Sequence, residues 1–462
     1  MMVMSKMLKC EDVGVWGSAE VNIFKHPHTP TSAHPHFHTP PLCIIKQENH
    51  IIIVISMEVA SVDYLDLMKE LSIKTASKIV MVVLDGLGGV EMEEGGMTEL
   101  EAARTPNMDE LVRHGVCGLM DPIAPGITPG SGPSHLGLFG YDPVRYEIGR
   151  GMLAAAGIGF ALEKGDVAAR GNFATIGKDG NILDRRAGRI STEENQRLCE
   201  KIGDLEVDGV RTFIRAVKEH RCVVVFRGEG LAGKLTDSDP QKEGREPKRV
   251  EALDKESEKT AAVVNRYLDI VRDILKDDHP ANMMLMRGFD IYPHLPSMRE
   301  VYRLTPAAVA AYPDYRGIAR LIGMDVLEPG ETIPEEIKTL LANYEKYDFF
   351  YLHFKKTDSK GEDGDFDGKV HVIEEVDRNL PVLLGKEPDV VVLTGDHSTP
   401  ALLKSHSWHP LPVVIRSKYC RRDGVVGFTE RNCAGGGLGR IRAVELMPLA
   451  MANGLKLLKF GA

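Results

Sequence analysis

The chain has 462 residues, of which 43% are hydrophobic and 27% charged, and its net charge is −10. This length predicts two domains of an ordinary soluble protein, and the acidic balance argues against nucleic acid as the main partner. No apolar stretch approaches the ~20 residues of a membrane span, and seven scattered cysteines without a signal-peptide pattern lead us to expect the reducing cytoplasm.

Residues 1–56 differ in composition from the rest of the chain. Five prolines and six of the sixteen histidines fall in this segment, including His34, His36 and His38. A histidine-rich tract can bind metal, but these histidines lack the spacing of a ligand set. We therefore favour a disordered extension, which would be translated upstream of a functional start at Met57.

A folded domain is predicted from Lys78 onwards. Ile79–Leu84 is a continuous apolar run, typical of a strand buried on both faces of a parallel α/β sheet. Asp85 follows at the carboxyl end of this strand, where α/β sheets bind ligands. Glycines at 86, 88 and 89 would let a metal or phosphate approach the backbone, although such a turn alone is a weak signal.

The remaining elements suggest a core that is split in the sequence. Thr105 and Pro106 are predicted to open a helix that Gly115 can end. Apolar runs predict strands at 222–226, 282–286, 349–354, 390–393 and 413–415, and a charged stretch at 234–259 predicts an exposed loop. Because the chemically reactive side chains fall before residue 160 and after residue 300, we expect an insertion between them.

Residues 128–135, TPGSGPSH, place a serine in an unusual position. An apolar helical run starts at Leu136, so Ser131 would lie at or before a helix N-terminus, which favours an anionic phosphate. The flanking glycines leave room for a phosphoryl group. A helix-capping role is the alternative for this serine, and Thr128 and Ser134 are rival hydroxyls.

Possible metal ligands follow two other strands. The strand at 390–393 runs into TGDHSTP, which places Asp396 and His397 at its carboxyl end. His406 and His409 follow in SHSWHP, and Asp358 follows the strand at 349–354 in an acidic segment without EF-hand spacing. Carboxylates and imidazoles bind divalent cations, which can activate a hydroxyl and hold a phosphate. We therefore expect a metal site that faces a serine nucleophile.

Five segments together resemble the alkaline phosphatase superfamily: VVLDGLGG, ARTPNMDEL, ITPGSGPSHLGLFGYDP, TGDHSTP and KSHSWHPLPVVI. Within it, RGNFAT, DRRAGRI, FRGEGL and MPLAMANGLKLLKFGA are similar to the archaeal-type branch of cofactor-independent phosphoglycerate mutases. The resemblance extends from about residue 76 to the end. It implies an α/β fold: an alkaline-phosphatase-like core with a mostly parallel sheet flanked by helices, at 57–160 and 301–462, and a smaller inserted α+β domain that caps the substrate, at 161–300.

The resemblance also implies a reaction and its site residues. The reaction is the interconversion of 2-phosphoglycerate and 3-phosphoglycerate without 2,3-bisphosphoglycerate, as in glycolysis and gluconeogenesis, with Ser131 as the nucleophile that becomes phosphoserine. Two divalent ions would be bound by Asp85, Ser131, Asp396 and His397 and by Asp358, Glu362 and His406. Glu362 replaces the histidine of the family pattern, which favours Mn²⁺ or Mg²⁺ over Zn²⁺, with Co²⁺ also possible. His135 and His353 are candidates for the proton shuttle.

Arginines of the insertion would bind the carboxylate and phosphate of the substrate, because a guanidinium pairs with both groups. The candidates are Arg186 and Arg189, followed by Arg170, Arg227 and Arg287. The expected partner is a small molecule, neither nucleic acid nor a membrane, and the sequence predicts no oligomeric state. Two alternatives stay open: a metal-dependent phosphatase or other phosphotransferase acting on a different small phosphate, and a non-catalytic metal- or phosphate-binding relative.

Overall fold

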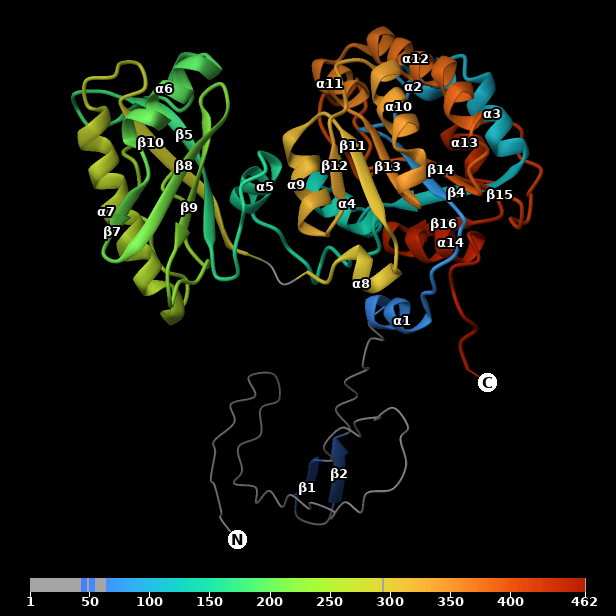
Figure 1. Cartoon of the computed structure of the whole chain (residues 1–462), viewed down its shortest axis with the longest axis horizontal. Coiled ribbons are helices and arrows are strands. Elements are labelled where there is room, and N and C mark those ends of the chain that lie inside the picture. Colours follow the sequence, from blue (N-terminus) through green and yellow to red (C-terminus); the bar gives the residue numbers. More distant parts are fainter. Residues whose placement is uncertain (1–42, 48–49, 55–63, 293–294, 462) are drawn as a thin grey trace. The chain divides into compact units, whose positions relative to one another are not determined.

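The computed structural model describes residues 43–47, 50–54, 64–292 and 295–461 (Figure 1). The extension predicted at 1–56, with its histidines, lies outside the described residues except for two short antiparallel strands, β1 (Cys43–Gln47) and β2 (His50–Val54). The chain divides into two compact units, Met1–Asp63 and Tyr64–Ala462, and the second contains every residue discussed below.

An eight-stranded sheet forms the core of the larger unit, in the order β12-β11-β13-β3-β14-β15-β4-β16. Its strands are β3 (Ile79–Leu84), β4 (Gly115–Asp121), β11 (Pro306–Ala310), β12 (Asp325–Leu327), β13 (Phe349–Phe354), β14 (Val390–Gly395), β15 (Leu411–Ser417) and β16 (Gly439–Arg442). Among these eight, β15 alone runs against its neighbours, and the other pairings are parallel. The expected mostly parallel α/β sheet is confirmed.

Helices cover this sheet, as continuous apolar strands require. One group of contacting helices comprises α2 (Glu99–Ala102), α3 (Pro106–Arg113), α10 (Ile333–Ala342), α11 (Lys356–Asp363), α12 (Phe366–Leu384) and α13 (Glu430–Cys433). The other helices of the core are α1 (Tyr64–Leu71), α4 (Ser131–Leu138), α8 (Met298–Tyr302), α9 (Pro313–Leu321) and α14 (Leu446–Asn453). All residues of β3, β13 and β14 are buried, as their sequences predicted.

Helix α3 begins at Pro106 as predicted, but it is capped from elsewhere in the chain. The Thr105 side chain makes no capping hydrogen bond. Instead, Asp377 on α12 accepts hydrogen bonds from the backbone N–H groups of Asn107 at 3.0 Å and Met108 at 2.8 Å. The helix ends at Arg113, and Gly115 opens β4, a strand that its glycine-containing sequence did not reveal.

A second, antiparallel sheet lies within the predicted insertion, in the order β10-β5-β9-β8-β7, with β6 paired to β5. Its strands are β5 (Val167–Ile176), β6 (Ile182–Asp184), β7 (Leu205–Val207), β8 (Val210–Lys218), β9 (Arg221–Arg227) and β10 (Met283–Ile291). The strands predicted at 222–226 and 282–286 correspond to β9 and β10. The boundaries of the insertion as a domain remain a prediction.

Alternate residues of this second sheet pack on opposite faces. Val224 and Phe226 of β9 join a cluster with α6 (Thr192–Ile202) and α7 (Glu258–Leu275). Val223 and Val225 join a different cluster with α5 (Arg150–Gly157), which also contacts α9. Among the residues that the structure describes, no helix has both the length and the apolar character needed to cross a bilayer.

The charged loop predicted at 234–259 is only partly exposed. Residues 241–246 are exposed, but Ser238 and Asp239 are buried. Ser238 exchanges hydrogen bonds with the backbone of Met286 on β10, and Asp239 accepts two from Arg185. The prediction of an exposed loop was therefore wrong at these two residues, because their polar groups find partners inside the fold.

Candidate functional site

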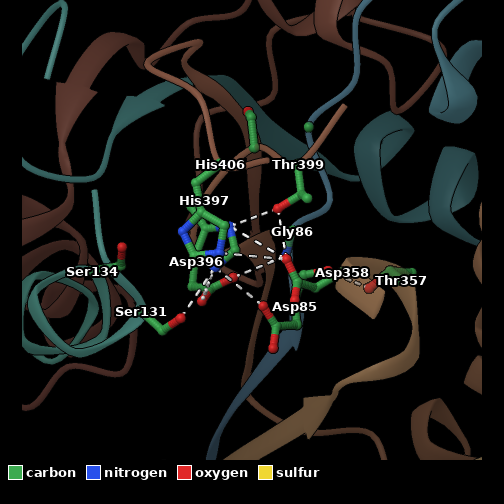
Figure 2. Close-up of polar contacts among 12 residues, drawn as sticks. Asp85, Gly86, Ser131, Ser134, Thr357, Asp358, Asp396, His397, Thr399 and His406 are labelled. Carbon is green, nitrogen blue, oxygen red and sulfur yellow. Dashed lines mark hydrogen bonds and ion pairs between the residues drawn. The ribbon is translucent and has the colours of Figure 1, made fainter. Parts of the chain in front are cut away.

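Three adjacent parallel strands bring the predicted metal ligands together (Figure 2). Asp85 follows β3, Asp396 and His397 follow β14, and Asp358 lies in the first turn of α11, just after β13. Ser131 is the first residue of α4, after the cap residue Gly130. Because parallel strands end at one edge of the sheet, residues far apart in the sequence become neighbours.

Three of the four ligands predicted for the first ion lie around a nitrogen atom of the fourth, His397. His397 Nε2 lies 3.3 Å from Asp85 Oδ1 and 3.2 Å from Asp396 Oδ2. The same nitrogen lies 3.4 Å from Ser131 Oγ. Asp85, Asp396 and His397 form a buried group with the spacing of metal ligands. The structure therefore places the proposed nucleophile next to this group.

Thr399 determines which nitrogen of His397 can bind a metal. Its Oγ1 donates to Asp358 Oδ1 at 2.7 Å, so it can only accept a hydrogen bond from His397 Nδ1, at 3.0 Å. His397 therefore carries its proton on Nδ1, and the lone pair of Nε2 faces Asp85, Asp396 and Ser131. Such a hydrogen bond behind a histidine ligand fixes both its tautomer and its orientation.

A second candidate group consists of Asp358, His397 and His406. His406 Nε2 lies 3.7 Å from Asp358 Oδ1, and the rings of His397 and His406 stack with centroids 3.6 Å apart. His406 Nδ1 donates to the carbonyl of Pro129 at 3.0 Å, which leaves Nε2 free to act as a ligand. His409 instead contacts Ser407 and Trp408, so the structure favours His406 of the two histidines.

Glu362 is less closely associated with these groups. It lies one turn after Asp358 on α11 and is exposed. Partial burial and the Asp358 carboxylate nevertheless raise the pKa of Glu362, and His406 opposes this shift. Glu362 thus interacts electrostatically with the second group without belonging to it as the side chains stand.

The charges at the first group suit a divalent cation. Burial, followed by the Asp85 carboxylate, raises the pKa of Asp396 well above its ordinary value. Burial would also raise the pKa of Asp85, but His353, His397 and Lys355 hold it well below its ordinary value. Burial lowers the pKa of His397 to about 3, which keeps the imidazole neutral. Asp85 Oδ1 and Asp396 Oδ2 are buried without a hydrogen-bond partner, and a cation would neutralise both carboxylates.

Sequence analysis did not single out two side chains that contact Asp85. Tyr315, on α9, donates a hydrogen bond to Asp85 Oδ2 at 2.5 Å. Lys355 Nζ lies 3.0 Å from the same oxygen and also forms an ion pair with Asp358. The position of Lys355, three residues before Asp358, could have suggested its role, whereas nothing in the sequence around Tyr315 does.

The structure also shows which of the three hydroxyl side chains in the 128–135 segment faces the candidate metal ligands. Ser134 is buried and donates to the carbonyl of Gly130 at 2.9 Å, and Thr128 is exposed. Ser131 is the one that faces His397. His135 donates from Nδ1 to the carbonyl of Ser131 at 2.8 Å, which anchors the first turn of α4.

The five predicted substrate arginines are not gathered at this site. Among the described residues, none of them forms a hydrogen bond or ion pair with the ligand groups. Arg227 pairs with Asp166, Arg170 pairs with Asp314, and Arg287 lies 4.0 Å from Asp239. Arg186 and Arg189 are exposed, and their guanidinium groups make no such contact within the described chain.

Comparisons with known proteins show the family to which the chain is similar. A family model described as 2,3-bisphosphoglycerate-independent phosphoglycerate mutase matches residues 112–282. A Thermus thermophilus protein, named "Probable 2,3-bisphosphoglycerate-independent phosphoglycerate mutase", is 52% identical over 405 residues, which cover 87% of this chain and 100% of the relative.

Two solved structures share the fold. The cofactor-independent phosphoglycerate mutase from Thermoplasma acidophilum matches with a TM-score of 0.66 and 34% identity, over 82% of this chain and 100% of that one. The PH0037 protein from Pyrococcus horikoshii matches with a TM-score of 0.73 and 32% identity, over 84% of this chain and 99% of that one. These matches confirm the predicted fold class.

Proposed function

This chain belongs to the 2,3-bisphosphoglycerate-independent phosphoglycerate mutases, a family of isomerases, and from that premise we propose that it interconverts 2- and 3-phosphoglycerate through a phosphoserine on Ser131. The observation that carries the proposal is the position of Ser131 Oγ, 3.4 Å from His397 Nε2 and at the first residue of α4. Five cysteines are free, which supports our proposal of a cytoplasmic enzyme of glycolysis: Cys117, Cys199, Cys222, Cys420 and Cys433.

The first half of the reaction transfers the phosphoryl group to the enzyme. Ser131 Oγ attacks the phosphorus of 3-phosphoglycerate, and the new Oγ–P bond forms as the bond from phosphorus to the C3 oxygen breaks. The backbone N–H groups in the first turn of α4 stabilise the negative phosphoryl oxygens. The proton that Ser131 loses is passed to the departing oxygen, and His135 and His353 are our candidates for this shuttle.

The second half returns the phosphoryl group to glycerate. The C2 oxygen of the retained glycerate gives up its proton and bonds to phosphorus as the Oγ–P bond of the phosphoserine breaks, and Ser131 leaves as an alkoxide that takes up that proton. Water must be excluded during this step, because hydrolysis of the phosphoserine would turn the mutase into a phosphatase. We propose that the inserted segment at 161–300 excludes water and that Arg186 and Arg189, with Arg170, Arg227 and Arg287 as further candidates, bind the substrate anion.

The residues of the two ligand groups fit a two-metal site. We propose that Asp85, Ser131, Asp396 and His397 hold one ion and that Asp358, Glu362 and His406 hold the other. When bound, two such ions, Mn²⁺ in our proposal, would lower the pKa of the serine hydroxyl and neutralise phosphoryl oxygens. The oxygen of Glu362 favours Mn²⁺ or Mg²⁺ over Zn²⁺.

A coupled assay of 3-phosphoglycerate conversion to 2-phosphoglycerate tests the proposal. Protein stripped of metal is supplied with Mn²⁺ in the absence of 2,3-bisphosphoglycerate. We expect turnover that depends on Mn²⁺ and is abolished in Ser131→Ala, because that variant lacks the attacking oxygen.

Ser134→Ala is the matched control, since it removes a hydroxyl from the same turn that faces away from His397. Its activity should stay close to that of the wild type. Release of inorganic phosphate in place of 2-phosphoglycerate would contradict the mutase and support the phosphatase alternative. Full activity of Ser131→Ala would contradict the assignment of the nucleophile.

A further inference from the structure

A lysine that the reaction does not use lies fully buried behind the ligand groups. Lys369, on α12, has no solvent exposure. Its Nζ donates hydrogen bonds to two backbone carbonyls, Gly88 at 3.0 Å and Thr399 at 2.9 Å. Burying an ammonium group is costly, so a lysine in this position needs a specific compensation.

The two carbonyls belong to the loops that carry the metal ligands. Gly88 lies three residues after Asp85, and Thr399 lies two residues after His397. These loops also pair with each other through bridges from Leu87 and Gly88 to Ser398. The Thr399 side chain forms hydrogen bonds with both Asp358 and His397. A displacement of the loop that contains Thr399 would therefore move ligands of both candidate metal groups.

Two glutamates, buried Glu99 and half-buried Glu430, complete the arrangement around Lys369. Glu99 Oε1 lies 3.7 Å from Lys369 Nζ and accepts a hydrogen bond from the backbone N–H of Ala401 at 2.7 Å. Glu430 accepts from the N–H of Gly89 at 2.9 Å, and its charge interacts with that of Lys369. The Lys369 ammonium therefore binds one backbone carbonyl in each loop. The two carboxylates bind backbone N–H groups of the same loops, one or two residues after those carbonyls.

We propose that Lys369 is a positioning residue that, together with Glu99 and Glu430, fixes the Asp85 loop and the Asp396–His397 loop at the separation required for metal binding. This inference rests on the proposed function, since it assumes that these loops bind divalent ions. Lys369 touches neither the reacting atoms nor the ligand side chains. Lys369 acts indirectly, because it keeps the metal ligands in the binding geometry before the ion binds.

Lys456 provides an internal control. It is also fully buried, and its Nζ donates to the carbonyl of Thr75 at 3.1 Å and lies 3.6 Å from Asp348. Its partners belong to the segment before β3 and to the turn before β13, at the opposite ends of these strands from the ligands. Replacing Lys456 therefore reproduces the loss of a buried ammonium without disturbing the ligand loops.

The test compares Mn²⁺ dissociation constants, measured by calorimetry on metal-stripped full-length protein, for wild type, Lys369→Met and Lys456→Met. We expect Lys369→Met to weaken Mn²⁺ binding by about 10- to 100-fold, the range for lost outer-shell support of a metal site. Its KM for 3-phosphoglycerate at saturating Mn²⁺ should be unchanged. Lys456→Met should lower the melting temperature but bind Mn²⁺ like the wild type.

A double variant keeps the test valid if Lys369→Met folds poorly. Lys369→Met/Glu99→Gln removes one uncompensated carboxylate and retains an oxygen to accept the bond from Ala401, so it should regain stability but not Mn²⁺ affinity. Wild-type affinity in either Lys369 variant, or an equal loss in Lys456→Met, would overturn the positioning role. Failure of the wild type itself to bind Mn²⁺ would contradict the proposed function instead.

Discussion

The two sheets of the larger unit differ in how charged side chains are arranged around them. At the carboxyl edge of the eight-stranded sheet, several carboxylates lie together: Lys355 pairs with Asp85 and Asp358, but Asp85 and Asp396 each keep a buried oxygen that has no hydrogen-bond partner. Around the antiparallel sheet, opposite charges are paired, as in the two hydrogen bonds that Arg227 donates to Asp166. Close packing of like charges is unfavourable by itself, so it indicates a site organised to bind a cation. Matched pairs instead stabilise the fold or position a side chain.

The largest expected effect comes from breaking the like-charge group. Asp85→Asn keeps the size of the side chain but removes a negative charge from the first ligand group. We expect kcat/KM for phosphoglycerate to fall by at least about a thousandfold, because several kcal/mol of electrostatic stabilisation are lost. Steady-state kinetics at saturating Mn²⁺ measure this, and circular dichroism checks that the variant is folded. A loss below tenfold would mean that Asp85 is not a ligand.

Substitution of the arginines should have a smaller effect. The exposed arginines and the ion-paired arginines should differ in which property changes, activity or stability. Arg189→Ala should lower kcat/KM by about 10- to 100-fold, the value of one charge-assisted hydrogen bond to substrate, with no change in melting temperature. Arg227→Ala should lower the melting temperature, because it leaves buried Asp166 without its partner. If Arg189→Ala has wild-type kinetics while Arg227→Ala does not, the paired arginines are the substrate ligands.

The smallest expected effect is on the pH dependence of the free energy of unfolding. One buried group near each sheet should change this free energy with pH, and the two changes should have opposite signs. Burial lowers the pKa of His220, in the antiparallel-sheet region, from 6.5 to about 4, so its contribution to stability is lost as pH falls through this range. Burial raises the pKa of Glu336, on α10, from 4.5 to about 8, so its contribution is lost as pH rises through that range.

Each group alone contributes a slope of at most about 1.4 kcal/mol per pH unit to the free energy of unfolding. His220→Gln should flatten the acid side of the stability profile, and Glu336→Gln should flatten the alkaline side. Urea denaturation of both variants across pH 4 to pH 8.5 measures the two slopes. Profiles that match the wild type would show that neither group titrates in the folded protein as its burial implies.

The same contrast explains which parts of the structure the sequence could predict. β3, β13 and β14 were predictable because strands buried on both faces are continuous apolar runs, and the proposed metal ligands follow at their ends. Ser131 at the start of α4 was predictable from local glycine, proline and apolar signals. The family resemblance then assigned roles that these local patterns suggested only as possibilities.

The residues that support the site could not be predicted in this way. Tyr315 and Lys369 act through contacts across more than 200 residues of sequence, and neither lies in a motif with a local chemical signature. Asp377 caps α3 from a distant helix for the same reason, although Thr105 had the expected local sequence. Strands β4 and β11 were missed because glycine, alanine and proline interrupt their apolar pattern. Tertiary contacts, which no single segment encodes, decide these features.

The central position of β3 has a consequence for how the protein is made. Its two neighbours in the sheet are β13, which begins at Phe349, and β14, which begins at Val390. A growing chain therefore carries the six apolar residues of β3 unpaired while the ribosome synthesises the whole antiparallel sheet. Such a strand is prone to aggregate, and sheets that depend on distant pairings form slowly. The centre of the core is thus completed only near the end of translation, and a chaperone that shields β3 until then would increase the yield of active enzyme.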